Sequence, residues 1–159
     1  MSCNVKPLEL PAATWTALML DLRRRGDGCR ETGAFLLGRE GATARTVGSW
    51  LPYDDLDPEA SAYDYIRLRT EAFSALWSFC ARTGAEVVGD IHTHPLGPTQ
   101  SPSDRANPMV AIAGHVAIIV PRFAMGDVTP ADVSVNVYRG DRRWSSYFGL
   151  AAASMIQMR

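Results

Sequence analysis

Two histidines and an aspartate stand close together in the chain at a spacing that suits metal chemistry. His92 and His94 are separated by one residue, and Asp104 follows ten residues later. The preceding residues 85–91 have the β-type composition of a strand, so the histidines lie at a strand end, where side chains i and i+2 point to the same side. Two neutral imidazoles and one carboxylate form a ligand set of catalytic zinc, with the fourth position left for water. We therefore predict that these residues bind one zinc ion per chain with a catalytic water.

The segment that leads to Asp104 also has the pattern of a helix start. Ser101 would be the N-cap, Pro102 the first helical residue and Asp104 the third, which is a capping-box-like arrangement. The predicted helix runs from Pro102 to about Ala113. Capping and metal binding are compatible, because a helix start holds the carboxylate in a fixed direction, as a metal site requires.

The arrangement His92-x-His94-Pro95 followed by Ser101-x-x-Asp104 resembles the signature of the JAB/MPN+ (JAMM) zinc metalloisopeptidases. Six residues separate His94 from Ser101, where the common pattern has seven, and the Pro- and Gly-containing loop between them can absorb such a deletion. The resemblance implies the MPN (JAB) fold, an α/β domain in which helices sandwich a mixed β-sheet.

The resemblance also implies roles for residues outside the ligand set. Glu31, which precedes an apolar run, looks like the upstream glutamate of the family and would be the general base that carries a proton to the leaving amine. By itself it would be taken for a surface acid in a turn. Ser101 would donate a hydrogen bond to the oxyanion. Thr93 is expected to be structural, and Asp90 either orients a ligand histidine or is a surface acid.

The family that this chain resembles hydrolyses the bond after the C-terminal glycine of a ubiquitin-like protein. Residues 104–108 and 114–121 look most like small stand-alone bacterial JAB peptidases of antiphage operons, of the CBASS or Bil type. The expected partners are a ubiquitin-like protein and its conjugates, together with operon-encoded activating and conjugating enzymes. The tail of the partner would lie as an added strand in a groove, with residues 53–62 and 121–131 as its walls.

The first of these loops is rich in acidic residues. We expect its acids to contact a basic surface of the partner; the alternative is that the loop is merely solvated. The four acids are Asp54, Asp55, Asp57 and Glu59.

Three other functions were weighed against this one. A peptidase that processes the C-terminus of a sulfur-carrier protein would share every site residue. A metal-free MPN scaffold would be expected to lack the ligands, which are present here. A zinc deaminase needs a P-C-x-x-C segment, and this sequence has none.

Length and composition set further bounds. A chain of 159 residues fits one domain, with a core over about residues 8–148. A net charge of −1 gives no electrostatic basis for binding nucleic acid. No signal-peptide pattern and no run of about eighteen apolar residues occur, so we expect a soluble, cytoplasmic protein without membrane contact.

The remaining elements follow from periodicity and turn signals. His115 is expected to lie in a turn or to contact the ligand residues, and not to bind the metal itself. The tail, residues 150–159, is either a short helix that caps the core or an expression remnant. Predicted helices cover residues 11–25 and 65–82, and predicted strands cover 33–39, 44–51, 116–120, 133–139 and 144–148, with a β-like piece at 5–10.

Overall fold

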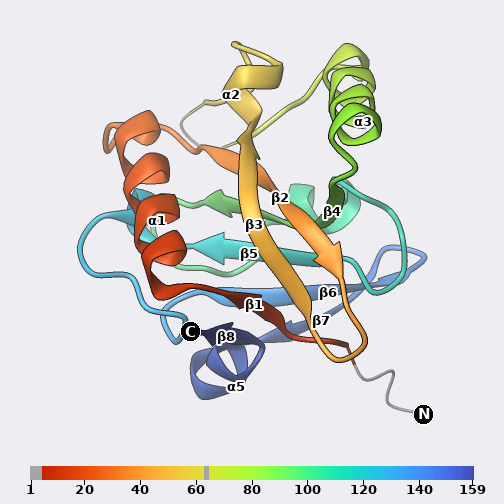
Figure 1. The fold of residues 1–159 in the computed structure, drawn as a ribbon. Helices are drawn as coiled ribbons and strands as arrows, with labels where there is room; N and C mark the ends of the chain where they lie inside the picture. The colour runs from red at the N-terminus through yellow and green to blue at the C-terminus, as the bar shows by residue number, and fades with distance from the viewer. Residues whose placement is uncertain (1–4, 63–64) are drawn as a thin grey trace.

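A mixed eight-stranded sheet with helices on both faces forms the frame of the protein (Figure 1). The computed structural model describes residues 5–62 and 65–159. The strand order is β7-β6-β5-β4-β2-β3-β1-β8. The strands are β1 (Leu8–Leu10), β2 (Gly33–Glu40), β3 (Arg45–Pro52), β4 (Glu86–Thr93), β5 (Val116–Val120), β6 (Ser134–Gly140), β7 (Arg143–Tyr147) and β8 (Ile156–Met158). The helices are α1 (Ala12–Gly26), α2 (Tyr53–Leu56), α3 (Thr70–Thr83), α4 (Pro102–Ala106), the 3-10 turn η1 (Arg122–Ala124) and α5 (Gly149–Ser154).

Each face of the sheet has its own apolar core. In β2, Leu36 joins the cluster to which α1 contributes Trp15. Its neighbour Phe35 joins the other cluster, with Leu76 of α3. Because successive strand residues point to opposite faces, a strand that is covered on both sides needs a continuous apolar run, and residues 34–37 supply it. The predicted α/β architecture, a mixed sheet between helices, is thus confirmed.

The central strand β4 has different neighbours on its two sides. It runs antiparallel to β2 and parallel to β5. The first residues of β2 and the last residues of β4 and β5 therefore lie side by side, at the same end of these strands. Among the described residues, no helix is long and apolar enough to cross a lipid bilayer.

The helix after the ligand loop is much shorter than predicted. The sequence pattern suggested a helix from Pro102 to Ala113, but α4 ends at Ala106, and Asn107 has left the helical region with φ −130° and ψ 68°. The reason is Pro108, whose ring disfavours the helical conformation in the residue before it.

The helix predicted over residues 65–82 begins later than expected. α3 starts at Thr70, and Ile66, which lies within the predicted range, instead forms a β-bridge with Ser61. Tertiary contacts of the segment before Thr70 override its helical pattern.

The C-terminal tail is part of the fold. It forms α5 and β8, and β8 pairs in parallel with β1. Ala152 and Ile156 are buried in the core on the α1 face. The core therefore extends beyond the predicted end at residue 148, because the last strand covers the edge of the sheet that β1 would otherwise expose.

Candidate metal centre

β4 and α4 bring His92, His94 and Asp104 to one point at the end of β4. The Nε2 atoms of the two histidines lie 3.1 Å apart. Carboxylate oxygens of Asp104 lie 3.4 Å from Nε2 of His92 and 3.1 Å from Nε2 of His94. Both histidines are buried, and Asp104 is partly buried. The three predicted ligands therefore form a compact triangle of atoms that is largely shielded from solvent.

The alternation of side chains along β4 explains why both imidazoles share one side. Thr93, between them, turns the other way, and its hydroxyl accepts a hydrogen bond from the Thr32 N–H at 3.0 Å, which agrees with its expected structural role. The N–H of His94 donates to the carbonyl of Val120 at 2.9 Å. The ligand pair is thus anchored to β2 on one side and to β5 on the other.

Asp104 reaches the histidines from the first turn of α4. Its N–H donates to Ser101 Oγ at 3.0 Å, and its Oδ2 accepts from the Ser101 N–H at 2.7 Å, which is the capping box that the sequence predicts. Burial alone would raise the pKa of the Asp104 carboxyl, but hydrogen bonds from His92, His94 and the Ser101 N–H hold this pKa well below its usual range. The carboxylate stays ionised, as a metal ligand must.

The spacing of the three groups fits a tetrahedral zinc site. Zinc–nitrogen bonds of about 2.0–2.1 Å at tetrahedral angles place neighbouring ligand atoms roughly 3.3 Å apart. The two Nε2 atoms lie 3.1 Å apart, Oδ1 of Asp104 lies 3.4 Å from Nε2 of His92, and the other oxygen, Oδ2, lies 3.1 Å from Nε2 of His94. One ligand atom from each residue lies within 4.8 Å of the other two. Three protein ligands leave one position for water, which distinguishes catalytic from structural zinc sites.

The environment of His92 favours positive charge. Burial alone would lower the pKa of its imidazole, but the hydrogen bond to Asp104 and the negative charges of Asp104, Asp90 and Glu31 outweigh burial and raise the pKa of His92 above its ordinary value. A site that stabilises a proton in this way also stabilises a cation.

The register between β2 and β4 carries Glu31 to the ligand triangle. Gly33 pairs with His92 in this antiparallel ladder, so continuing the pairing by two residues sets Glu31 opposite His94. Glu31 Oε1 lies 4.0 Å from His94 Nε2, and the residue is only 5% exposed. A buried carboxylate beside the ligands is well placed to take up and deliver a proton.

The comparison with known protein families concerns this same part of the chain. The family described as prokaryotic homologs of the JAB domain matches residues 11–136, which include Glu31 and all three members of the triangle. This chain belongs to that prokaryotic JAB family. The family includes metalloproteases, and His92, His94 and Asp104 of this JAB domain could hold a metal ion.

Two solved structures share the fold of this JAB domain. A solution structure of a protein from Desulfitobacterium hafniense aligns with a TM-score of 0.69 at 14% identity, over 96% of this chain and 92% of that one. A solution structure from Salinibacter ruber aligns with a TM-score of 0.58 at 15% identity, over 87% of this chain and 88% of that one. At such low identities, the likeness shows the fold alone.

A narrow pocket of about 50 Å³ lies beside the ligand triangle, with His92 and Asp104 in its wall. It adjoins a wider groove of about 670 Å³. The two hollows share as lining residues Ile66, Ser103, Asn107, Pro108 and Met109.

Contact of residues 53–62 and 121–131 with the tail of a partner stays a prediction, because these loops do not line the two hollows beside the ligand triangle in the described part of the chain. Among the described residues that line the pocket and the groove, none comes from 53–62 or 121–131; the outer wall is formed by residues 65–68. Residues 53–56 form a helical turn instead, and η1 packs against α1.

Most of the acidic loop is engaged within the chain. Three of its acids form ion pairs with arginines: Asp54 with Arg30 at 3.8 Å, Asp55 with Arg25 at 3.0 Å and Asp57 with Arg69 at 2.9 Å. Glu59 is exposed. Contact of the four acids with a basic partner stays a prediction. To make such a contact, the three paired acids would have to bind the partner in addition to their arginines or in place of them.

Asp90 and His115 form a buried pair behind the triangle. Their Oδ2 and Nε2 atoms lie 2.6 Å apart. Asp90 thus contacts His115, the residue before β5. It does not orient His92, because Nδ1 of His92 has no hydrogen-bond partner among the described residues. Tyr53 is also buried here, and burial together with the charge of Asp90 raises the pKa of its hydroxyl well above the ordinary value.

Several residues that line the narrow pocket have no signal in the sequence. Ile66, Met109 and Trp144 come from three distant segments. Their apolar types are those of ordinary core residues, so no local pattern marks them. Only the tertiary structure brings these segments together.

Proposed function

We propose that this JAB domain is a zinc-dependent isopeptidase or peptidase that hydrolyses the bond after the C-terminal glycine of a ubiquitin-like protein. The observation that carries the proposal is the close grouping of His92, His94 and Asp104, with one ligand atom of each within 4.8 Å of the others and Glu31 Oε1 4.0 Å from His94 Nε2. A ligand set with one open position and a buried carboxylate beside it is the minimal equipment for metal-assisted amide hydrolysis.

His92, His94 and Asp104 would hold the ion, which when bound lowers the pKa of a water ligand to about 7 and polarises a carbonyl group. Glu31 takes the proton from the attacking water and delivers it to the departing nitrogen. That delivery is obligatory, because an amine is too poor a leaving group to depart as its anion. The Ser101 hydroxyl donates a hydrogen bond to the carbonyl oxygen as negative charge develops on it. The Ser101 Oγ atom accepts from the Asp104 N–H, which leaves its own proton free to donate.

The narrow pocket supports a glycine next to the cleaved bond. The pocket is small, at about 50 Å³, and His92 and Asp104 form part of its wall. We expect a residue without a long side chain to be favoured there. The adjoining groove of about 670 Å³ is lined on one side by the extended residues 65–68, against which an extended tail can lie.

We further propose that the substrates are conjugates made by activating and conjugating enzymes encoded in the same operon, in bacterial antiviral defence. This placement rests on the resemblance of residues 104–108 and 114–121 to stand-alone JAB peptidases. Processing of a ubiquitin-like or sulfur-carrier precursor uses the same residues, so the substrate panel of the test includes both types of bond.

The test is cleavage of ubiquitin-like proteins encoded near this protein in its genome. Each is joined to a reporter protein through a lysine isopeptide bond or as a C-terminal extension. Wild-type protein is expected to cut after the glycine with zinc and to stop when a chelator is added. Glu31→Gln is expected to keep its zinc, bind the substrate and lose at least about a hundredfold in turnover.

Glu86→Gln is the matched control, because this exposed glutamate lies at the opposite end of β4 and is expected to leave the rate unchanged. Cleavage by Glu31→Gln within about threefold of the wild-type rate, against the general-base effect just given, would show that Glu31 is not the base.

A further inference from the structure

The segment of residues 57–69 begins and ends at one charged contact. Asp57 Oδ1 accepts a hydrogen bond from Arg69 Nη2 at 2.9 Å, and Oδ2 accepts from Arg69 Nε at 2.9 Å and from the Arg69 backbone N–H at 3.2 Å. The Asp57 side chain is 3% exposed. The Arg69 guanidinium holds the pKa of this carboxyl below its ordinary value. The two ends of the segment are therefore joined by a bidentate ion pair.

Between these ends, the chain forms a small antiparallel hairpin. Ser61 and Ile66 form a β-bridge, and the Arg67 N–H donates to the Ala60 carbonyl at 2.9 Å. An isolated two-stranded hairpin is marginally stable at best, so the position of this one depends on contacts at its base. The described residues of the hairpin are 60–62 and 65–67.

One strand of the hairpin contacts the catalytic segment, and the other lines the groove. The Ala62 carbonyl accepts from the Glu31 N–H at 2.6 Å. Ile66, on the other strand, lines both the narrow pocket beside the ligand triangle and the adjoining groove. A shift of the hairpin would therefore move the backbone of Glu31 and the wall of the groove together.

The ion pair is suited to holding this hairpin, not to stabilising the whole domain. The Arg69 side chain is 63% exposed, and such ion pairs contribute little to global stability because solvent screens them. Loops held by a few contacts open locally, without global unfolding. Loss of the pair would thus release the hairpin and leave the sheet intact.

We propose that Asp57 and Arg69 are positioning residues whose ion pair, here called the clasp, keeps the hairpin closed against Glu31 and keeps the groove ready for the tail of the substrate. The substrate part of this inference rests on the proposed function, whereas the closing of the hairpin does not. Because bound substrate would itself hold the hairpin closed, loss of the clasp is expected to raise KM more than it lowers kcat.

The first measurement is amide hydrogen exchange of the zinc-loaded, full-length protein. In Asp57→Asn and Arg69→Gln, the amides of Ala62 and Arg67 are expected to exchange about threefold to fivefold faster, the change expected from loss of one ion pair whose arginine is exposed to solvent. Zinc content and Tm are expected to stay near those of the wild type. Arg69→Lys keeps the charge but not the planar fork, so it is expected to be intermediate.

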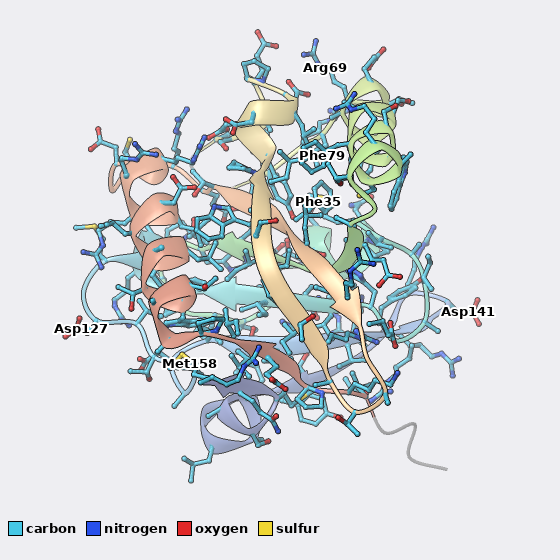
Figure 2. All side chains as sticks on the ribbon, in the orientation of Figure 1. Phe35, Arg69, Phe79, Asp127, Asp141 and Met158 are labelled. Carbon is cyan, nitrogen blue, oxygen red and sulfur yellow. The ribbon has the colours of Figure 1, made fainter. Side chains whose placement is uncertain are left out.

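The matched control is Asp141→Asn. Asp141 pairs with Arg143 at 3.8 Å, and both side chains are largely exposed. Figure 2 shows Asp141 on a different side of the molecule from Arg69. This control removes an exposed aspartate–arginine pair and is expected to leave exchange in the hairpin and the kinetics unchanged.

The second measurement is the kinetics of cleavage of a ubiquitin-like substrate. Asp57→Asn and Arg69→Gln are expected to raise KM by about threefold to fivefold with kcat within about twofold of wild type, and Arg69→Lys is expected to lie between. Faster exchange with an unchanged KM would overturn the positioning role.

Other outcomes bear on the clasp itself. Unchanged exchange at Ala62 and Arg67 in both variants would overturn it, and so would a fall in Tm as large as that of a core substitution, since the pair would then hold the domain. If the wild-type protein cleaves none of the substrates, the proposed function fails, but the exchange rates still decide whether the clasp exists.

Discussion

The carboxylate of Asp104 caps a helix and completes the ligand triangle at the same time. Its Oδ2 accepts from the Ser101 N–H at 2.7 Å and lies 3.1 Å from His94 Nε2. A backbone donor thus fixes the direction of a ligand, which is the usual task of hydrogen bonds around a metal site. The same short segment supplies the ligand and the means of orienting it.

The ligand assignment predicts which substitutions remove zinc. His92→Ala and Asp104→Ala are expected to lose the ion, whereas Glu31→Gln is expected to retain about one per chain. His115→Gln is the control, because this buried histidine pairs with Asp90 and not with the triangle. The measurement is elemental analysis of purified protein. Full zinc occupancy in a His92→Ala, His94→Ala double variant would disprove the assignment.

Zinc affinity is expected to fall with decreasing pH, starting above the ordinary histidine pKa of about 6.5. The pKa of His92 is raised because Asp104 and nearby negative charges outweigh the opposing effect of burial. Below this pKa the imidazole carries a proton that zinc must displace, and above it the nitrogen is free to bind. Titration calorimetry in buffers of different ionisation enthalpy measures the protons released. Affinity that does not change between about pH 5.5 and 8 would contradict this expectation.

Ser101→Ala tests two roles of one hydroxyl. Loss of the N-cap is expected to lower the free energy of unfolding by about 1 kcal/mol, and loss of an oxyanion donor is expected to lower turnover about tenfold to a thousandfold. Ser101→Thr keeps the cap and the hydroxyl and is expected to resemble wild type. Thermal unfolding and turnover are measured on the same samples. A stability loss with an unchanged rate would leave Ser101 as a cap alone.

At the scale of elements, the register between β2 and β4 sets the distance between Glu31 and the candidate ligands. Gly33 pairs with His92 where these two strands are closest to the site. An added Cβ at Gly33 would lie 2.5 Å from the Ile91 carbonyl oxygen, 2.5 Å from a Tyr53 ring carbon and 2.9 Å from His92 Cβ. Part of this contact is backbone, so no change of side-chain rotamer can relieve it, and the strands must shift.

Gly33→Ala is therefore expected to cost at least about 1–3 kcal/mol of stability and to weaken zinc binding, because the shift displaces His92. The control is Gly48→Ala in β3, where an added Cβ meets no atom within 4 Å and alanine is expected to be neutral or slightly stabilising. Chemical denaturation and zinc titration of both variants check this. Wild-type stability of Gly33→Ala would mean that the strands have more freedom than the structure indicates.

At the scale of the whole molecule, the two ends of the chain close one edge of the sheet together. β1 and β8 pair in parallel, and both lie in the lower part of the molecule as drawn in Figure 1. Ile156 in β8 is 4% exposed and belongs to the core on the α1 face. The sheet order places these strands far from β4, so the tail supports the fold and not the site.

Ile156→Ala is expected to lower the free energy of unfolding by about 2–5 kcal/mol without a change in zinc content. Leu150→Ala is the matched control, because Leu150 is 85% exposed and buries little surface to lose. Denaturant unfolding of both variants gives the comparison. Equal stability of the two would show that the tail is not packed as described.

Local patterns in the sequence determined which residues are the candidate ligands. The spacing of His92 and His94 and the cap at Ser101 depend on neighbouring residues only, and the structure keeps both. The helix over residues 11–25 and the strand over residues 33–39 were predicted for the same reason. Pro108 is a local indication that α4 ends early, but the capping pattern at Ser101 favoured a longer helix.

Contacts between distant segments were decided by the tertiary structure alone. Glu31 meets His94 through strand pairing, and Asp57 meets Arg69 across a loop. No local sequence pattern identifies either pair, because the register of a sheet depends on how both of its faces are buried. The lining of the groove and the burial of the C-terminal tail also depend on contacts between distant segments. The family resemblance pointed to Glu31, but its distance from the ligands depends on how β2 and β4 pack between two layers of helices.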